Sequence, residues 1–266
     1  MAKGADFSLV DRTVVITGGG GILGKRMVQA LAEAGARVAI VEADLARAQS
    51  VVDQIEGKGV VEAFSADISK PQAVVAVHER IEASFGPVYG LVNNAATKSE
   101  NFFEPFETFP LDDWNAVIGV NLTGAMTCCQ VFGKAMVANG GGAIVNTLSI
   151  YGIVAPDQRI YEGSIYEGRR INTPAVYSAS KAGLWGLTKY LSAYWGDKNV
   201  RVNALTPGGV FSGQNDTFVK AYSNRVPMGR MAHHDEMSGA LVFLLSDASS
   251  FVTGQNVVID GGLSVW

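Results

Sequence analysis

The chain has 266 residues, a formal net charge of −4 and 48% hydrophobic residues, which is enough to bury a large core in one α/β domain. Its Lys and Arg residues are scattered and offer no basic field to a polyanion, which argues against nucleic acid as a partner. The N-terminal residues lack the layout of a signal peptide, and no apolar run looks long enough to span a bilayer. We therefore expect a soluble, cytoplasmic protein with no membrane partner.

Short β-branched runs alternate with longer segments whose apolar residues recur at three- and four-residue spacing. We expect strands at 13–17, 37–42, 60–65, 88–94, 143–147, 200–206 and 256–260, and helices that include 22–34, 45–55 and 71–85. This alternation predicts a single domain over 1–266, with a doubly wound α/β fold and a seven-stranded parallel sheet flanked by helices, in the manner of a Rossmann fold. Right-handed crossovers bring the loops after the strands to one edge, where such sheets bind ligands.

The only two cysteines, Cys128 and Cys129, are adjacent on a predicted helix. Neighbouring helical side chains diverge, and this spacing is not that of metal ligands. We expect both to be small buried hydrophobic residues, and we expect no metal site.

The segment "VVITGGGGILGKRM" places Gly19, Gly21 and Gly24 in a dinucleotide-binding fingerprint, between a strand and a helix. Glycines let the backbone approach a pyrophosphate closely, and the N–H groups at the helix N-terminus stabilise its charge. Gly24 would let helix and strand pack closely together. The alternative interpretation is a flexible turn, since four glycines in a row also fit one.

Glu42 closes the second predicted strand, 18 positions after Gly24, where a carboxylate would accept hydrogen bonds from the adenosine ribose. The same carboxylate would repel a 2′-phosphate, and neither the glycine loop nor Ala43 and Asp44 offer a cation to bind one. The sequence therefore favours NAD, with NADP as the alternative. Taken alone, Glu42 also fits a solvated strand end.

Tyr177 and Lys181, in "YSASK", lie four residues apart and so share one face of a predicted helix. A nearby ammonium, aided by a cationic oxidised nicotinamide, favours phenolate and lowers the tyrosine pKa, which would make Tyr177 a general acid–base for hydride transfer. An isolated match to this spacing is more often an ordinary pair on a helix surface.

Further motifs accompany this pair, and together they make the chain resemble the short-chain dehydrogenase/reductase family, compact single-domain type, over essentially its whole length. The motifs are "ADI" (66–68), "NNAA" (93–96), "VNLTG" (120–124), "NTLSIYG" (146–152), "TPGGV" (206–210) and "TGQNVVIDGG" (253–262). The resemblance implies an NAD(P)-dependent oxidoreductase that interconverts a secondary alcohol and a carbonyl. It also implies a homotetramer or homodimer built from helix pairs and the C-terminal segment around "GGLSVW".

The same resemblance implies roles for single residues. Tyr177 would carry the proton, Lys181 would bind the nicotinamide ribose and lower the Tyr177 pKa, Ser149 would hydrogen-bond the substrate oxygen, and Asn121 would hold a proton-relay water. The implied cofactor-binding set, in which Asp67 meets the adenine and Asn93 lies beside the ribose, is Thr17, Gly18, Gly19, Gly21, Ile22, Leu23, Gly24, Glu42, Asp67, Ile68, Asn93, Ala95, Tyr177, Lys181, Pro207, Gly208 and Val210. Each position has a structural alternative: Ser149 also fits a loop cap, and Asn121 also fits a bridge in a bent helix.

Two features depart from the compact pattern. The glycine spacing, with Ile22 after Gly21, is more typical of extended, sugar-nucleotide-modifying members. Ser149 and Tyr177 are 28 positions apart, so a polar insert at about 153–173 joins two catalytic residues and is expected to shape the substrate pocket. The insert resembles, more weakly, that of oxidoreductases of bacterial surface-sugar pathways.

Six residues in and beside the insert are candidate substrate contacts. The arginines would bind an anionic group and the tyrosines would pack on a sugar ring; the candidates are Tyr151, Arg159, Tyr161, Tyr166, Arg169 and Arg170. A solvated loop or a subunit contact is the alternative for each. Resemblance further implies a mobile lid at about 207–235.

The sequence thus favours an enzyme that oxidises or reduces a polar, sugar-derived small molecule with NAD. One alternative is a nucleotide-sugar epimerase or dehydratase that recycles its NAD internally. Another is a non-catalytic dinucleotide-binding regulator, which would need none of the four catalytic residues.

Overall fold

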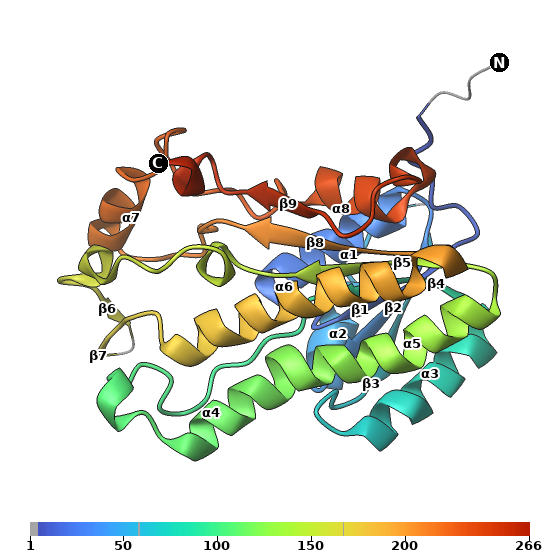
Figure 1. The fold of residues 1–266 in the computed structure, drawn as a ribbon, viewed down its shortest axis with the longest axis horizontal. Coiled ribbons are helices and arrows are strands. Elements are labelled where there is room, and N and C mark those ends of the chain that lie inside the picture. The colour runs from blue at the N-terminus through green and yellow to red at the C-terminus, as the bar shows by residue number, and fades with distance from the viewer. Residues whose placement is uncertain (1–4, 58, 167) are drawn as a thin grey trace.

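The computed structural model describes residues 5–57, 59–166 and 168–266 (Figure 1). Seven parallel strands form one twisted sheet in the order β3-β2-β1-β4-β5-β8-β9. The strands are β1 (Thr13–Thr17), β2 (Arg37–Glu42), β3 (Val61–Ser65), β4 (Val88–Asn93), β5 (Gly142–Thr147), β8 (Val200–Pro207) and β9 (Asn256–Ile259). The predicted doubly wound sheet is confirmed, and no strand boundary differs from the predicted one by more than one residue.

Helices cover both faces of the sheet. They are α1 (Ile22–Glu33), α2 (Leu45–Val52), α3 (Pro71–Phe85), α4 (Leu111–Ile118), α5 (Ala125–Ala138), α6 (Ala175–Trp195), α7 (Asp216–Ser223) and α8 (Ser238–Leu245). The central strands β1, β5 and β8 are buried along their whole length, as expected for a parallel sheet that is covered on both faces.

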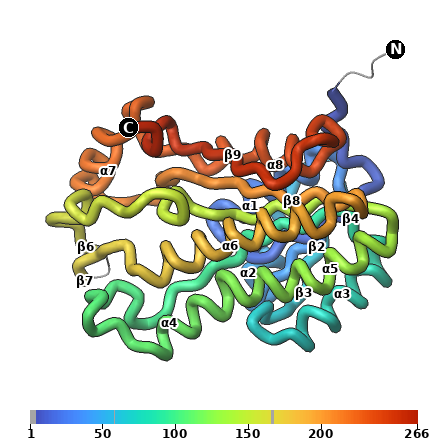
Figure 2. The backbone as a smooth tube through the Cα atoms, viewed as in Figure 1, coloured from blue at the N-terminus to red at the C-terminus, as the bar shows by residue number. Residues whose placement is uncertain are grey.

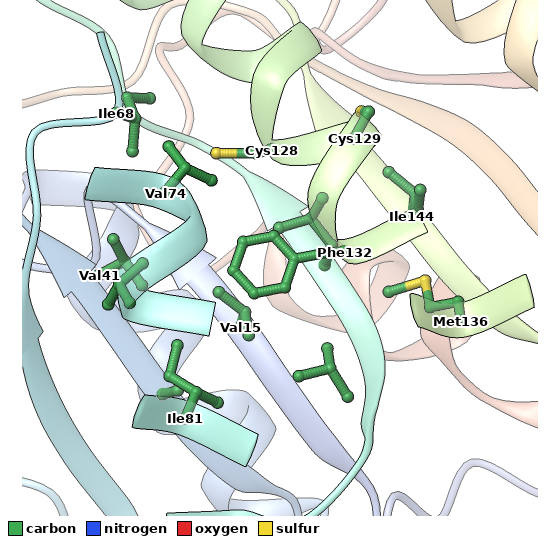
Figure 3. Close-up of a cluster of buried hydrophobic side chains, with 14 of the residues drawn as sticks. Val15, Val41, Ile68, Val74, Ile81, Cys128, Cys129, Phe132, Met136 and Ile144 are labelled. Carbon is green, nitrogen blue, oxygen red and sulfur yellow. The ribbon is translucent and has the colours of Figure 1, made fainter. Parts of the chain in front are cut away.

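The core is divided by the sheet into two layers, because successive strand side chains point to opposite faces. On one face, Phe132 of α5 and Ile81 of α3 pack with Val15 and Val41 in one buried cluster (Figure 3). On the other face, α1, α2 and α8 pack on the alternate strand residues, such as Ile16. Both layers hold the carboxyl ends of the strands in place, which is where the predicted motifs lie.

Cys128 and Cys129 lie inside the first of these layers (Figure 3). Both are at most 1% exposed. Burial raises the pKa of both thiols, that of Cys129 to about 12. The prediction of small buried hydrophobic residues is therefore confirmed.

One continuous helical run, Leu111–Ala138, corrects the expectation that no apolar segment is long enough to cross a bilayer. It joins α4, a π-helical turn (Gly119–Gly124) and α5, and by length and composition it could cross a membrane. Half of its most apolar window is buried in the protein, and α5 packs on the sheet through Phe132. The run is accordingly a core helix of the domain.

The insert contains two elements that the sequence did not predict. A 3-10 turn at Gln158–Tyr161 is followed by a short antiparallel hairpin, β6 (Ile165–Tyr166) with β7 (Arg169–Arg170). The insert lies at the same end of the molecule as α4 and α7 (Figure 2). Ile160 of the turn shares a small buried cluster with Phe218 of α7, so insert and predicted lid pack together.

Candidate active site

The glycine loop between β1 and α1 has a geometry that other residues would disturb. Gly18 has a φ of +66°, and a Cβ on Gly24 would lie 2.3 Å from the Gly18 carbonyl oxygen. The first turn of α1 therefore sits directly against the loop, as the sequence predicted for Gly24. No side chain caps this helix, so its N-terminal N–H groups face the loop and suit a pyrophosphate.

A cavity of about 430 Å³ opens beside this loop at the carboxyl edge of the sheet. Its lining includes more than half of the predicted cofactor residues: Gly18, Gly21, Ile22, Leu23, Gly24, Glu42, Asp67, Ile68 and Ala95. Glu42 accepts hydrogen bonds from the backbone N–H groups of Gly20 (3.2 Å) and Ala43 (3.1 Å). The glycine cradle, the uncapped helix and this oriented carboxylate together fit a dinucleotide.

Arg47 also lines this cavity and was missed by the sequence analysis. It lies in the first turn of α2, whose N-cap is Asp44, and its guanidinium donates to the Gly20 carbonyl at 3.4 Å. In the sequence, neither the glycine loop nor Ala43 and Asp44 offer a cation, whereas three more residues of helix bring Arg47 back over the loop. The premise that no cation lies near Glu42 is therefore corrected.

Asn93 does not lie where the resemblance implied. Its side chain is 3% exposed and donates to Asn146 Oδ1 (2.8 Å) and Cys129 Sγ (3.2 Å), inside the core. Asn94 lines the cavity instead, and its amide donates to the carbonyls of Thr17 (3.2 Å) and Gly18 (3.0 Å). Neighbouring residues at a strand end face opposite sides, so Asn94 and not Asn93 faces this cavity.

Three other predicted cofactor residues serve as support. Thr17 is buried, and its hydroxyl accepts from the backbone of Asn94 and Ala95, each at 3.1 Å. Gly19 faces the core, where a Cβ would lie 2.7 Å from the Ile40 side chain. Pro207 is the buried last residue of β8 and lines neither the cavity beside the glycine loop nor the one that contains Ser149 and Tyr177.

A second cavity of about 570 Å³ adjoins the first, and both share Ile22, Ala96 and Thr97 in their linings. It contains the predicted catalytic residues Ser149 and Tyr177, which lie close enough for Ser149 to influence the pKa of the phenol. The predicted residues Gly208 and Val210 line it as well, as do Tyr151 and Tyr161 from the insert segment. We call it the catalytic cavity.

Lys181 lies behind Tyr177, with Nζ 5.9 Å from the centre of the tyrosine ring. It is 3% exposed, and Nζ donates to the Thr147 carbonyl at 2.8 Å. Burial lowers the Lys181 pKa to about 8. The tyrosine and the lysine are therefore together, as predicted, but neither faces open solvent.

The surroundings of Tyr177 within the protein raise its pKa, whereas the sequence predicts that Lys181 and an oxidised nicotinamide together lower it. Burial of the phenol raises it, the hydrogen bond from Ser149 opposes this, and the nearby Tyr161 hydroxyl raises it further. Desolvation thus outweighs the expected effect of Lys181, and Tyr177 is a neutral hydroxyl at neutral pH. A further positive charge beside it would be needed to make it a base.

Asn121 lies in the π-helical turn between α4 and α5. Its Oδ1 accepts from the Thr97 backbone (2.9 Å), and its Nδ2 donates to Ser180 Oγ (3.3 Å). Ser180 Oγ in turn donates to the Tyr177 carbonyl at 2.8 Å. These contacts match the alternative of a bridge in an irregular helix, and they connect Asn121 to the backbone of Tyr177.

The candidate substrate residues separate into two groups. Tyr161 hydrogen-bonds the Thr173 hydroxyl and also Tyr151 (3.4 Å), so both tyrosines present polar groups at the catalytic cavity. Arg159 is instead paired with Asp157 at 2.8 Å. Arg169 donates to the Glu100 carbonyl at 3.2 Å.

None of the three insert arginines lines the catalytic cavity, and their binding of an anionic group stays a prediction. Arg170 borders a separate cavity. The side chain of Tyr166 lies outside the part of the chain that the structure describes.

Comparison with known proteins agrees with this geometry. Residues 12–222 match the family described as short chain dehydrogenase. The chain is 34% identical to D-threitol dehydrogenase of Mycolicibacterium smegmatis, over 98% of this chain and 95% of the relative. It is 29% identical to an NAD-dependent glycerol dehydrogenase of Listeria innocua, over 98% and 96%. A solved gluconate 5-dehydrogenase from Burkholderia cenocepacia, in complex with NADP and tartrate, has a TM-score of 0.85 and 31% identity over 98% of both chains.

A serine and a tyrosine that line one cavity beside a buried lysine, next to a glycine-loop pocket, fit the chemistry of these relatives. The chain therefore belongs to the short-chain dehydrogenase/reductase family, and it is an oxidoreductase that acts on CH–OH groups with NAD or NADP.

Proposed function

We propose that this enzyme interconverts a secondary alcohol and a ketone on an uncharged polyol or a similar hydroxylated substrate, and that it prefers NAD. The observation that carries the proposal is that Ser149 and Tyr177 line the same cavity, which adjoins the glycine-loop cavity. The names of two relatives, a D-threitol and a glycerol dehydrogenase, support a polyol. The hydroxyls of Tyr151 and Tyr161 in the same cavity suit the other hydroxyl groups of such a molecule.

In this proposal, bound NAD⁺ supplies the hydride acceptor and a positive charge next to the site. Ser149 hydrogen-bonds the substrate oxygen, and Tyr177 takes the proton from that oxygen during oxidation and returns it during reduction. Lys181, fixed by the Thr147 carbonyl, favours the phenolate, since its charge is held in the low-dielectric interior. Asn121 holds the backbone of the Tyr177 turn in position through Ser180.

The function is tested by incubating the purified chain with a panel of polyols and ketoses and NAD(H), and following NADH absorbance. We expect net NADH formation from at least one polyol and its consumption with the matching ketose. An epimerase or dehydratase that recycles NAD would convert its substrate without net NADH. A dinucleotide-binding regulator would bind NADH and convert nothing, and either result would reject the proposal.

Cofactor choice is proposed to depend on two opposed side chains, Glu42 and Arg47, which flank Gly20. Glu42→Ala should lower the NAD:NADP ratio of kcat/KM about tenfold, because it removes the carboxylate that repels a 2′-phosphate. Arg47→Ala should raise that ratio by weakening the use of NADP. Asp53→Ala, at the far end of α2, serves as the control. Unchanged ratios in both variants would locate the discrimination elsewhere.

Three further assignments belong to the same proposal. The segment 207–235, whose residues from Gly208 to Gln214 border the catalytic cavity, would act as a lid. The insert at 153–173 would shape substrate choice. The enzyme would be a cytoplasmic homotetramer or homodimer, in keeping with the exposed aromatic residues of α6 and the C-terminus.

A further inference from the structure

The largest cavity of the described chain, about 1050 Å³, lies next to the catalytic cavity but is distinct from it. Its walls come from the insert, the segment 104–109, α4 and the first turn of α6. The two cavities share Tyr161 and the segment 171–174, which form a partition between them. The hydrogen bond between the hydroxyls of Tyr161 and Thr173 lies within this partition. Neither the catalytic pair nor the glycine loop borders the larger cavity.

Buried polar atoms without partners are concentrated in this cavity. In the described part of the chain, Ser164 Oγ, Asn172 Oδ1 and Ser178 Oγ are buried and have no hydrogen-bond partner, and all three residues line it. Ser164 is only 1% exposed. An unpaired buried polar group costs about 1–3 kcal/mol, so such groups indicate a site that a water or ligand completes.

The remaining lining determines which ligand fits. Trp114 and Phe109 provide aromatic surface, which packs well on the apolar C–H face of a sugar ring. The carboxylates Glu104, Glu107 and Glu162 are hydrogen-bond acceptors for hydroxyl or ammonium donors.

The charges of the cavity lining further restrict which class of ligand fits. Three carboxylates face the single guanidinium of Arg170 in this lining, so the cavity carries an excess of negative charge. That excess disfavours a phosphate or a carboxylate, and it favours a neutral or amino sugar.

We propose that this cavity is a second site, which binds an uncharged or amino sugar separately from the substrate in the catalytic cavity. The hydroxyls of the ligand form hydrogen bonds with Ser164, Ser178 and Asn172, and its ring packs on Trp114. The glutamates disfavour a negatively charged ligand. Because Tyr161 and Thr173 belong to both cavities, occupancy of this site changes the KM of the catalytic substrate and leaves NADH affinity unchanged.

The experiment compares galactose, galactosamine and galacturonate, which differ mainly in charge, in titrations against the full-length protein by saturation-transfer NMR. We expect saturable binding of galactose and galactosamine, with galacturonate at least tenfold weaker. Ser164→Ala should weaken galactose binding at least threefold without lowering Tm, because it removes an unpaired hydroxyl. Glu107→Gln should weaken galactosamine more than galactose. Ser192→Ala on α6, whose hydroxyl bonds the Lys189 carbonyl far from this lining, is the matched control.

The proposal is overturned if none of the three sugars binds saturably, or if galacturonate binds as tightly as galactose. It is also overturned if Ser164→Ala binds galactose like the wild type while Tyr151→Phe, which borders only the catalytic cavity, loses binding. The result is independent of the proposed reaction, since a protein that oxidises no polyol but shows this pattern would retain the second site and lose only the proposed activity.

Discussion

At the scale of single residues, burial governs the chemistry of the catalytic cavity more than proximity does. Tyr177 and Lys181 are neighbours on α6, yet desolvation moves the pKa of each toward its neutral form: up for the phenol and down for the ammonium. At neutral pH the phenol is therefore neutral, while the ammonium, with a pKa of about 8, keeps most of its charge. Added positive charge, which a bound oxidised nicotinamide carries, would favour the phenolate.

Replacing the phenol tests its role in proton transfer. Tyr177→Phe should lower kcat about 10²–10⁴-fold, the usual contribution of a general acid–base, while NADH affinity stays within about twofold. Steady-state kinetics and NADH fluorescence titration measure the two quantities. Tyr194→Phe, near the other end of the same helix, is the control. Retained turnover in Tyr177→Phe would remove Tyr177 as the proton carrier.

We expect buried Lys181 to lower the stability of the folded protein, although the enzyme needs it for activity. The Lys181 pKa falls from 10.5 to about 8 on folding, so its destabilising effect is complete below about pH 8 and disappears as the pH rises through 10.5. Lys181→Met should therefore be inactive but more stable by about 1–3 kcal/mol at neutral pH.

Urea denaturation from neutral pH toward 10.5, the unperturbed lysine value, checks this prediction. The advantage of Lys181→Met over the wild type should shrink with rising pH. A variant that is less stable than the wild type at neutral pH, or an advantage that grows with pH, would contradict the assigned direction of the pKa shift.

At the scale of elements, the contact between β1 and α1 positions the cofactor cavity. A Cβ on Gly24 would lie only 2.3 Å from the carbonyl oxygen of Gly18 in the loop. Helix and loop therefore approach within a distance that only glycine allows. By contrast, a Cβ on Gly186 of α6 would meet nothing within 4 Å.

The two glycines make a matched pair. Gly24→Ala should cost about 1–3 kcal/mol of stability and weaken NADH binding, because α1 must move away from the loop. Gly186→Ala should be neutral or stabilise by up to about 1 kcal/mol, since alanine is the better helix former. Thermal unfolding and NADH titration compare them. Equal effects of the two substitutions would show that the close approach at Gly24 does not matter.

At the scale of the whole molecule, apolar surface outside the two active-site cavities indicates where copies of the chain would meet. Tyr190 and Tyr194 of α6 are 64% and 54% exposed, and their rings stack at 5.8 Å. At the C-terminus, Trp266 is 78% exposed. Surfaces of this kind are typical of protein interfaces.

Light scattering tests the proposed assembly. The wild type should have the mass of a tetramer or dimer, and the double substitution Tyr190→Glu with Tyr194→Glu should reduce it by half, because each glutamate would be buried without a partner. Val75→Glu, at an exposed apolar position of α3, should leave the mass unchanged. A monomeric wild type would rule the assembly out.

Much of the fold and part of the site could be read from local sequence. The seven strands follow from β-branched runs, the crossover helices from apolar spacing, and the tight turn from Gly18 and Gly24. Residues four apart on a helix must share a face, so Tyr177 and Lys181 were found together. Each of these inferences concerns neighbours along the chain, whose geometry the backbone itself dictates.

The remaining features depend on segments far apart in the chain. Packing between elements decides whether Asn93 or Asn94 faces the cofactor cavity. It also brings Arg47 to Gly20 and leaves the insert arginines outside the lining of the catalytic cavity. The pKa of Tyr177 likewise depends on how many atoms exclude water from it. Burial and charge act through space, and distances through space are settled only when the strands and helices come together.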